Sequence, residues 1–96
     1  MTVSGRLIEL DVLRHTPAGV AVMQFRLQHD STQLEAGAER KVSCEIAAVA
    51  FEREATLLAA ARLGSGVKVT GFLAARSRTS KSVVLHATEV EFKEGD

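Results

Sequence analysis

Apolar and polar residues alternate along most of this chain, and an alanine-rich segment interrupts the alternation once. The alternating runs are residues 5–14, 20–29, 41–47, 67–75 and 83–92. A period of two is typical of β-strands with one buried face. The interrupting segment, AAVAFEREATLLAAARLGSG, has apolar residues at helical intervals and ends at glycines. The pattern therefore predicts five strands and one helix, with the helix over roughly Ala50–Leu63.

Two polar segments separate the early strands. HTPAG is typical of a tight turn, because Pro17 presets its own φ and Gly19 accepts a positive φ. The first two strands are therefore expected to form a hairpin. The polar segment from Asp30 to Arg40 has no sustained period, so we expect it to be a long connection. Within the fourth strand, Gly71 predicts a bulge or bend.

The alternation also predicts which side chains face the core. In the first and third strands the expected inward set is Ile8, Leu10, Val12, Val42, Cys44 and Ile46. Cys44 is therefore expected to be a buried thiol and not a nucleophile. Among the aromatic residues, Phe25 and Phe51 are expected in the core, whereas Phe72 is expected on the outer face with Lys68.

The order strand–strand–strand–helix–strand–strand is that of the OB fold, a five-stranded Greek-key barrel. We therefore expect a mainly β protein with one short helix between strands three and four. A glycine in the fourth strand suits the strong coiling of a small barrel. Another small barrel or an open α+β sheet is the competing arrangement. At 96 residues the chain is expected to be a single domain, 1–96, and its small core favours a homodimer.

Charge is balanced over the whole chain but is unevenly distributed. There are 12 Lys and Arg residues and 12 Asp and Glu residues. No acidic residue lies between Ala55 and Thr88, and the expected loop within this stretch carries Arg76, Arg78 and Lys81. An acid-free basic segment indicates an anionic partner. A solvated, solubilising turn is the alternative interpretation of the same residues.

The sequence contains no motif for catalysis or metal binding. No Gly-rich phosphate loop precedes the helix, and no G-x-S-x-G elbow is present. The three histidines and one cysteine do not match a metal-ligand spacing. His86 alternates with Val84, Val90 and Phe92, which favours a hydrogen-bonded structural histidine. We expect no enzymatic activity, no cofactor and no small-molecule substrate.

The N-terminal segment MTVSGRLIEL has neither a basic stretch leading into an apolar run nor a lipidation motif. No apolar stretch approaches the roughly 20 residues that span a bilayer. The single cysteine allows no disulfide within the chain. A cytoplasmic protein without a membrane partner is therefore expected.

Several segments resemble a known family. VSGRLIELDVLRHTPAGVAVMQFRLQH and VTGFLAA resemble bacterial single-stranded DNA-binding proteins. FRLQHDSTQLEAGAERKVSC resembles the primosomal replication protein N (PriB) family in its L-x-H element, its S-x-Q-x-E-A-G loop and the basic strand that follows. VVLHATEVEF resembles the last strand of that family. The resemblance implies a homodimer of OB domains that binds single-stranded DNA and acts in replication restart with the PriA helicase and DnaT.

The resemblance also implies a set of basic residues that contact DNA. They lie near the first turn, after the second strand and between the last two strands, at Arg14, Arg40, Lys41, Arg76, Arg78 and Lys81. Ala38 and Ser43 stand where some relatives present aromatic residues. Base stacking on aromatic residues is worth ~1–3 kcal/mol per base. Without it we expect weak, salt-sensitive binding through phosphate contacts.

Two other functions stay open. The first is an adaptor that binds and stimulates a helicase and has only weak affinity for single-stranded DNA. The second is a general single-strand binder, which is less expected because the ending EFKEGD is too short to recruit partners.

Overall fold

The computed structural model describes residues 1–75 and 82–93, with the backbone alone for residues 32–35, 40 and 42. Within these residues the chain forms six strands and one helix, in the order β1 (Thr2–Leu10), β2 (Arg14–His15), β3 (Ala21–Glu35), β4 (Ala38–Phe51), α1 (Glu52–Ala59), β5 (Gly66–Ala75) and β6 (Val83–Phe92). Because β1 and β2 together cover the first expected strand, the expected order of elements is confirmed.

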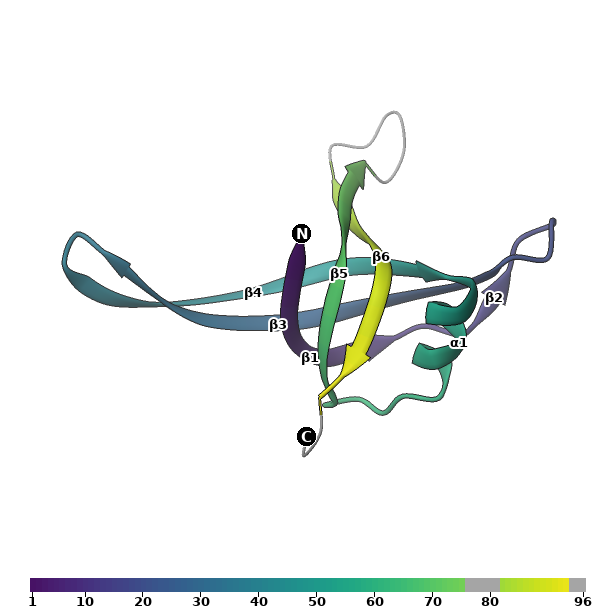
Figure 1. Ribbon diagram of the computed structural model, residues 1–96, viewed down its shortest axis with the longest axis horizontal. Coiled ribbons are helices and arrows are strands. Elements are labelled where there is room, and N and C mark those ends of the chain that lie inside the picture. The colour runs from purple at the N-terminus through teal and green to yellow at the C-terminus, as the bar shows by residue number, and fades with distance from the viewer. Residues whose placement is uncertain (76–81, 94–96) are drawn as a thin grey trace.

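The strands close into a barrel. They are ordered β1-β5-β6-β4-β3-β2, and an additional pairing of β1 with β3 completes the circle. The pairing of β4 with β6 is parallel and joins Ala48 to Leu85, Val49 to His86 and Ala50 to Ala87. In Figure 1, β5 and β6 cross the long β3–β4 hairpin, and α1 lies beside the barrel. This is the five-stranded OB fold with one helix, as expected.

The core fills the barrel and continues under α1. Its fully buried large side chains are Leu7, Leu27, Leu58, Leu85, Val67 and Val69. The helix contributes Ala55 and Leu58 to this cluster. Phe25 is also buried, as expected. Within the described residues, no helix is long and apolar enough to cross a membrane.

A bulge in β1 overturns the expected inward set of the first strand. The register of β1 against β3 shifts between Leu7 and Glu9, so the alternation changes phase at Ile8. Leu7 is fully buried, whereas Ile8 is 38% and Val12 71% exposed. The expectation that Ile8 and Val12 face the core was therefore wrong. Leu10 packs against the core, as expected.

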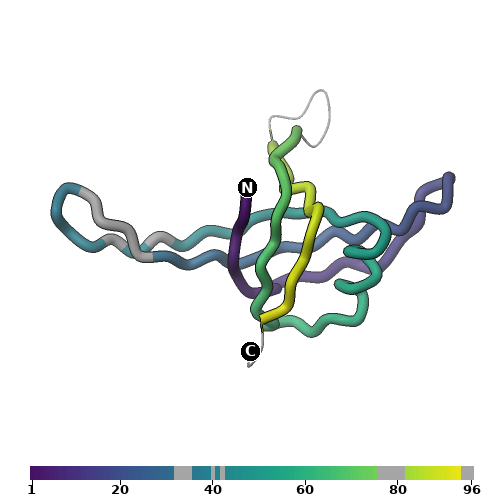
Figure 2. The backbone as a smooth tube through the Cα atoms, viewed as in Figure 1, coloured from purple at the N-terminus to yellow at the C-terminus, as the bar shows by residue number. Residues whose placement is uncertain are grey.

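The segment from Asp30 to Arg40 is a hairpin, so the expected long connection was wrong. β3 and β4 pair without a break from Val22 opposite Phe51 to Glu35 opposite Ala38. The turn consists of Ala36 and Gly37, with φ of 52° and 81°. Two positive φ values match a two-residue hairpin turn whose twist suits the strands. We call the part of this hairpin beyond Gln28 and Glu45 the arm; Figure 2 shows it extending away from the barrel.

Cys44 lies on the arm and is exposed, so the expectation of a buried thiol was wrong. It has the same alternation as Ala48 and Ala50, which are buried. However, β1 pairs with β3 only as far as Arg6 opposite Gln28, and Cys44 lies opposite His29, just beyond that point. The face that is internal in the barrel is therefore open in the arm.

The turn, the helix and the bulge near Gly71 are present as expected. In the turn, Gly19 has a φ of 85° and donates its N–H to the carbonyl of Thr16 at 2.8 Å. The helix begins two residues later and ends four residues earlier than expected, at Glu52–Ala59. The chain after it returns to β1 through the N–H of Gly64, which bonds to the carbonyl of Leu7. The register of β5 against β6 shifts at Gly71, as expected.

Candidate nucleic-acid interface

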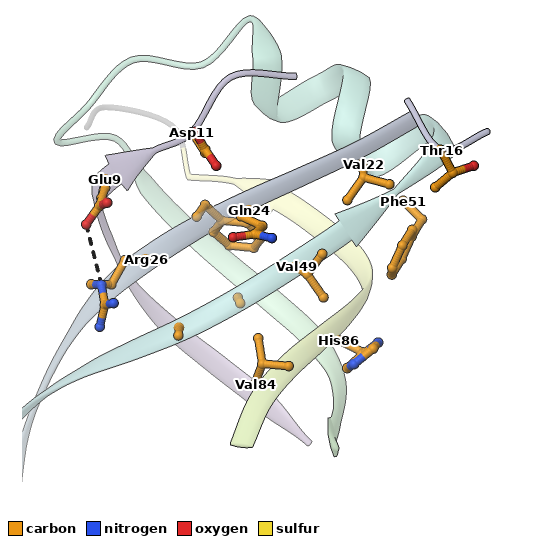
Figure 3. A pocket seen from close by; sticks show the side chains of 13 residues that line it. Glu9, Asp11, Thr16, Val22, Gln24, Arg26, Val49, Phe51, Val84 and His86 are labelled. Atoms are coloured by element: carbon orange, nitrogen blue, oxygen red, sulfur yellow. Dashed lines mark ion pairs between the residues drawn. The ribbon is translucent and has the colours of Figure 1, made fainter. Parts of the chain in front are cut away.

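A hollow of about 490 Å³ lies on the outer face of β3, β4 and β6. Its volume is within the ~300–1,000 Å³ range of ligand pockets in proteins. The lining is mainly apolar at one end and charged at the other, and it comprises Glu9, Asp11, Thr16, Val22, Gln24, Phe25, Arg26, Ala47, Ala48, Val49, Phe51, Val84 and His86. Figure 3 shows Phe51 and His86 at one end, Glu9 and Arg26 at the other, and Gln24 between them.

Three aromatic rings stack beside the apolar end of the hollow. The ring centroids of Phe72 and His86 are 5.1 Å apart with planes inclined by 13°, and those of Phe51 and His86 are 6.0 Å apart with planes inclined by 26°. Phe72 is 54% exposed and Phe51 39% exposed, whereas His86 is half-buried between them. We call these three residues the ring stack. The two outer rings of the stack are therefore partly open to solvent.

The β-sheet register explains why the three rings meet. On β6, His86 lies opposite Phe72 of β5 on one side and beside Val49 of β4 on the other. Phe51 follows Val49 by two residues in β4, so it lies on the same face of the sheet. The ring stack is therefore held by three adjacent strands of the barrel. His86 was expected to be a hydrogen-bonded structural histidine; its observed neighbours are the two phenyl rings.

The bulge in β6 also corrects the face assigned to His86. Between Thr70 and Gly71, β5 advances by one residue while its partner moves from Glu89 to Ala87. The hydroxyl of Thr88 donates a hydrogen bond to the carbonyl of Thr70 at 3.0 Å. The alternation of inward-facing and outward-facing residues in β6 therefore reverses at Thr88. Val84 and His86 therefore line the outer hollow, whereas Val90 is buried, and the expectation that they share a face was wrong.

Charged residues at the other end of the hollow form exposed ion pairs. The Nε of Arg26 lies 3.5 Å from a carboxylate oxygen of Glu9, and a guanidinium nitrogen of Arg14 lies 3.9 Å from one of Asp11. Exposed pairs of this type contribute about 0–1 kcal/mol each. Their significance here is electrostatic: Glu9 in β1 and Asp11 just after it place two carboxylates, each paired with an arginine, at this end of the hollow, whereas β6 lines it with Val84 and His86.

Of the expected DNA-contacting residues, the structure describes the side chains of Arg14 and Lys41, and it places these two far apart. Arg14, in β2, is exposed at the barrel end of the long hairpin, opposite Val22. Lys41 is exposed on the arm, opposite Thr32. Ten strand residues between Val22 and Thr32 span about 33 Å. Arg40 lies next to Lys41, with only its backbone described, and Arg76, Arg78 and Lys81 lie outside the described residues.

Sequence reasoning missed Phe51 and His86 as surface residues of this site. The helix was expected to begin at Ala50, which placed Phe51 among its buried positions. Because β4 continues to Phe51, this residue instead shares the outer face of that strand with Val49 and Ala47. Extending the alternation of the third strand by four residues would have revealed it. Phe72 is exposed, as expected.

A small polar network lies where the arm that carries Lys41 leaves the barrel. The amide nitrogen of Gln28 donates hydrogen bonds to Asp30, at 3.3 Å, and to the hydroxyl of Ser43. The pKa of Asp30 is lowered from its ordinary value, first by a hydrogen bond from Ser43 and then by the one from Gln28. These bonds favour the carboxylate over the carboxylic acid.

We therefore expect Asp30 to titrate below its ordinary pKa of 3.8 in the folded protein. Because the pKa is lower in the folded than in the unfolded chain, ionised Asp30 stabilises the fold above the unfolded value. This contribution disappears as the pH falls through the folded value. Carbon-detected NMR titration of the carboxyl group checks this, and Ser43→Ala should move the midpoint back towards 3.8. A wild-type midpoint at or above that value would contradict the network.

Comparison with known proteins identifies the family. Residues 1–89 match the model of a family described as another single-strand binding protein family. A replication restart protein PriB of Nitrosomonas europaea is 38% identical over 87 residues, which cover 91% of this chain and 81% of that protein. The chain belongs to the PriB family. The PriB of Bordetella pertussis is 42% identical over 86 residues, covering 90% of this chain and 80% of the relative.

Solved structures agree with this assignment. The PriB structure from Ralstonia solanacearum superposes with a TM-score of 0.84 at 28% identity, covering 97% of this chain and 96% of that chain. The wild-type single-stranded DNA-binding protein of Thermus aquaticus has a TM-score of 0.80 at 24% identity, covering 98% of this chain and 49% of that chain. The second likeness shows a shared fold alone. The resemblance of this sequence to PriB and to the OB-fold single-strand binders is thus confirmed.

Proposed function

We propose that this protein is a non-enzymatic, cytoplasmic component of the replication restart machinery that holds single-stranded DNA at stalled forks. The observation that carries the proposal is the 38–42% identity, over about nine-tenths of the chain, to proteins named replication restart protein PriB. The partners implied by the resemblance are the PriA helicase and DnaT. The whole chain, 1–96, acts as one OB domain.

Basic side chains supply the proposed DNA contacts. Arg76, Arg78 and Lys81 follow β5 and lie in the stretch without acidic residues, where phosphates meet no repulsion from neighbours in sequence. Arg14 lies at one end of the long hairpin, and Arg40 and Lys41 lie on its arm. Phosphate contacts along such a path bind many sequences equally, because the backbone carries no base information.

The protein acts as a homodimer in this proposal. Leu73 and Val83 are 50% and 56% exposed where β5 and β6 extend past the barrel, and Met1 nearby is 61% exposed. The N–H of Gly71 bonds to the carbonyl of Met1, which places the N-terminus against the same strands. A second copy that covered these side chains would enlarge a small core and would join two DNA paths into one.

The proposal is tested by titrating fluorescein-labelled oligo-dT with the purified protein at several salt concentrations and measuring anisotropy. Each phosphate contact on a single strand contributes about −0.7 to the slope of log K against log salt. With contacts from three residues of the basic segment alone, we expect a slope of about −2 or steeper. Absence of binding at 50 mM salt would overturn the proposal, and a slope near zero would remove the phosphate contacts from it.

The second candidate function is the helicase adaptor, which Ala38 and Ser43 favour because they replace aromatic residues of some relatives. Both residues lie on the arm, and Ala38 begins β4. A variant that has lost DNA binding decides between the two functions. If it still stimulates the PriA helicase as well as the wild type does, the adaptor function replaces DNA binding as the main role.

A further inference from the structure

The ring stack is an exposed aromatic surface that the basic segment does not account for. Burying a phenylalanine side chain is worth about 1.5–3 kcal/mol, so leaving Phe51 and Phe72 open has a cost in the free protein. Their neighbours hold them in place, because the three rings project from adjacent strands of a closed barrel. Exposed apolar surface on a rigid scaffold marks a binding site.

The geometry of the rings fits a nucleobase. The planes of Phe72 and His86 are inclined by only 13°, and Phe51 continues the stack on the other side. A flat ring can therefore stack on the open face of either phenylalanine. Phe51 and His86 border the hollow, whereas Phe72 lies on the far side of His86, on β5. Two bases of one strand, separated by intervening nucleotides, could therefore use the two ends of the ring stack.

The charges around the hollow orient the strand. Glu9 and Asp11 are paired with Arg26 and Arg14 at one side of the hollow, so this side offers a phosphate no net positive charge but tolerates an uncharged base. On the opposite side, β5 and the first part of β6 carry no acidic residue up to Thr88. The backbone of a bound strand would thus run along β5 and β6, with its bases directed into the hollow.

Gln24 gives the hollow a polar group that suits the edge of a base. Its side chain lies between the two ends of the hollow in Figure 3. A carboxamide has both donors and an acceptor, so it can bond to the edge of any base.

The ring stack also lies close to the basic segment along the chain. From Phe72, β5 continues for three residues to Ala75, about 10 Å, before the basic segment begins.

We propose that the ring stack of Phe51, His86 and Phe72 is a base-stacking site for a single DNA strand, with the adjoining hollow receiving one base against Gln24. This inference rests on the proposed function and adds to it a second, uncharged mode of contact. It places the stacking residues away from Ala38 and Ser43, where some relatives carry their aromatic residues.

A single introduced tryptophan reports on this site directly. The chain contains no Trp and no Tyr, so Phe72→Trp would carry the only strong fluorophore. We expect its emission to be quenched as oligo-dT is added, with the same midpoint as anisotropy. Phe92→Trp is the matched control, because Phe92 is 41% exposed and lies opposite Val67, at the other end of β5. Its emission should stay unchanged when DNA binds.

Leucine substitutions separate stacking from simple apolar packing. Phe51→Leu and Phe72→Leu should each weaken binding of oligo-dT about fivefold or more, the lower end of the effect of one stacked base, while Phe92→Leu stays within twofold of the wild type. Since stacking involves no counterion release, the loss should be equal at 50 and 300 mM salt.

Each other outcome overturns the inference. DNA binding by Phe72→Trp without quenching, or leucine variants that bind as the wild type does, would leave the proposed function intact and remove the stacking site. Leucine variants that keep DNA affinity but lose helicase stimulation would make the ring stack a protein-docking surface instead. A wild-type protein that binds no single-stranded DNA would end both proposals.

Discussion

Reversing the charge of the basic segment, by Arg76→Glu, Arg78→Glu and Lys81→Glu together, should lower the affinity for oligo-dT by about 500-fold at 50 mM salt. Each lost phosphate contact removes the release of about 0.7 counterion, and at this salt concentration that release raises the binding constant roughly eightfold. At 300 mM salt the same three contacts are worth only about tenfold. Anisotropy titrations at the two concentrations measure the effect, which should shrink with salt, in contrast to that of the leucine variants.

The control for this variant changes the same charge elsewhere. Arg53, Arg62 and Lys93 are exposed and lie outside the proposed DNA path. Replacing these three with Glu alters the net charge equally, so a comparable loss of affinity would show that overall charge, and not the basic segment, drives binding. Both variants should unfold within a few degrees of the wild type. Unchanged affinity in the first variant would make the segment a solubilising turn.

Gly71→Ala should lower the free energy of unfolding by about 3 kcal/mol, at the upper end of overpacking costs. A Cβ at this position would overlap the carbonyl oxygen of His86 and would lie 3.1 Å from the Cα of Ala87. These are backbone atoms of a paired strand, so they cannot move aside as a flexible side chain would. In a domain of this size the loss corresponds to a decrease in melting temperature of roughly 12–24 °C. Thermal unfolding followed by circular dichroism measures it.

Gly64→Ala is the matched comparison for this prediction. Gly64 has a φ of +88°, and a Cβ there would meet no atom within 4 Å. Its substitution tests the cost of backbone conformation alone, about 1–2 kcal/mol. If Gly71→Ala proved no more destabilising than Gly64→Ala, the close approach of β5 to His86 would not be a constraint on the barrel.

The order of the elements could be predicted from the sequence because each strand has one buried face. The alternation around Leu27 and the helical spacing of Ala55 and Leu58 reflect the burial of these residues, and together with the order of the segments they predicted the OB fold. Gly71 indicated a bulge because a residue without a Cβ weakens the interior of a regular strand and is typical of a bend or a close backbone approach. These local patterns were sufficient to predict the order of the strands and the helix.

The arm could not be predicted in this way. Its two strands lie beyond the barrel, where β1 no longer pairs with β3, so no buried face imposes an apolar period on them. The only local sign of the hairpin was the pair Ala36–Gly37, and positive φ at an alanine is unusual. The exposure of Cys44 follows from the same cause.

The candidate site depended on details that alternation does not contain. The bulge at Ile8 and the one near Thr88 each change the phase of a strand, so they alter which residues reach the outer face. Phe51 became a surface residue because β4 continues past the point where the helical spacing begins. Pairing across strands distant in sequence then placed its ring beside that of His86.

The parallel ladder between β4 and β6 has a consequence for how the protein becomes functional. Both antiparallel hairpins join neighbours in sequence and can form early, whereas the pairing of Val49 with His86 must bridge the helix and β5. We therefore expect this short ladder to form after the two hairpins. Phe72 and His86 already meet within the β5–β6 hairpin, whereas Phe51 joins them only when the ladder has formed. Stacking of a DNA base on Phe51 beside His86 would then require the closed barrel.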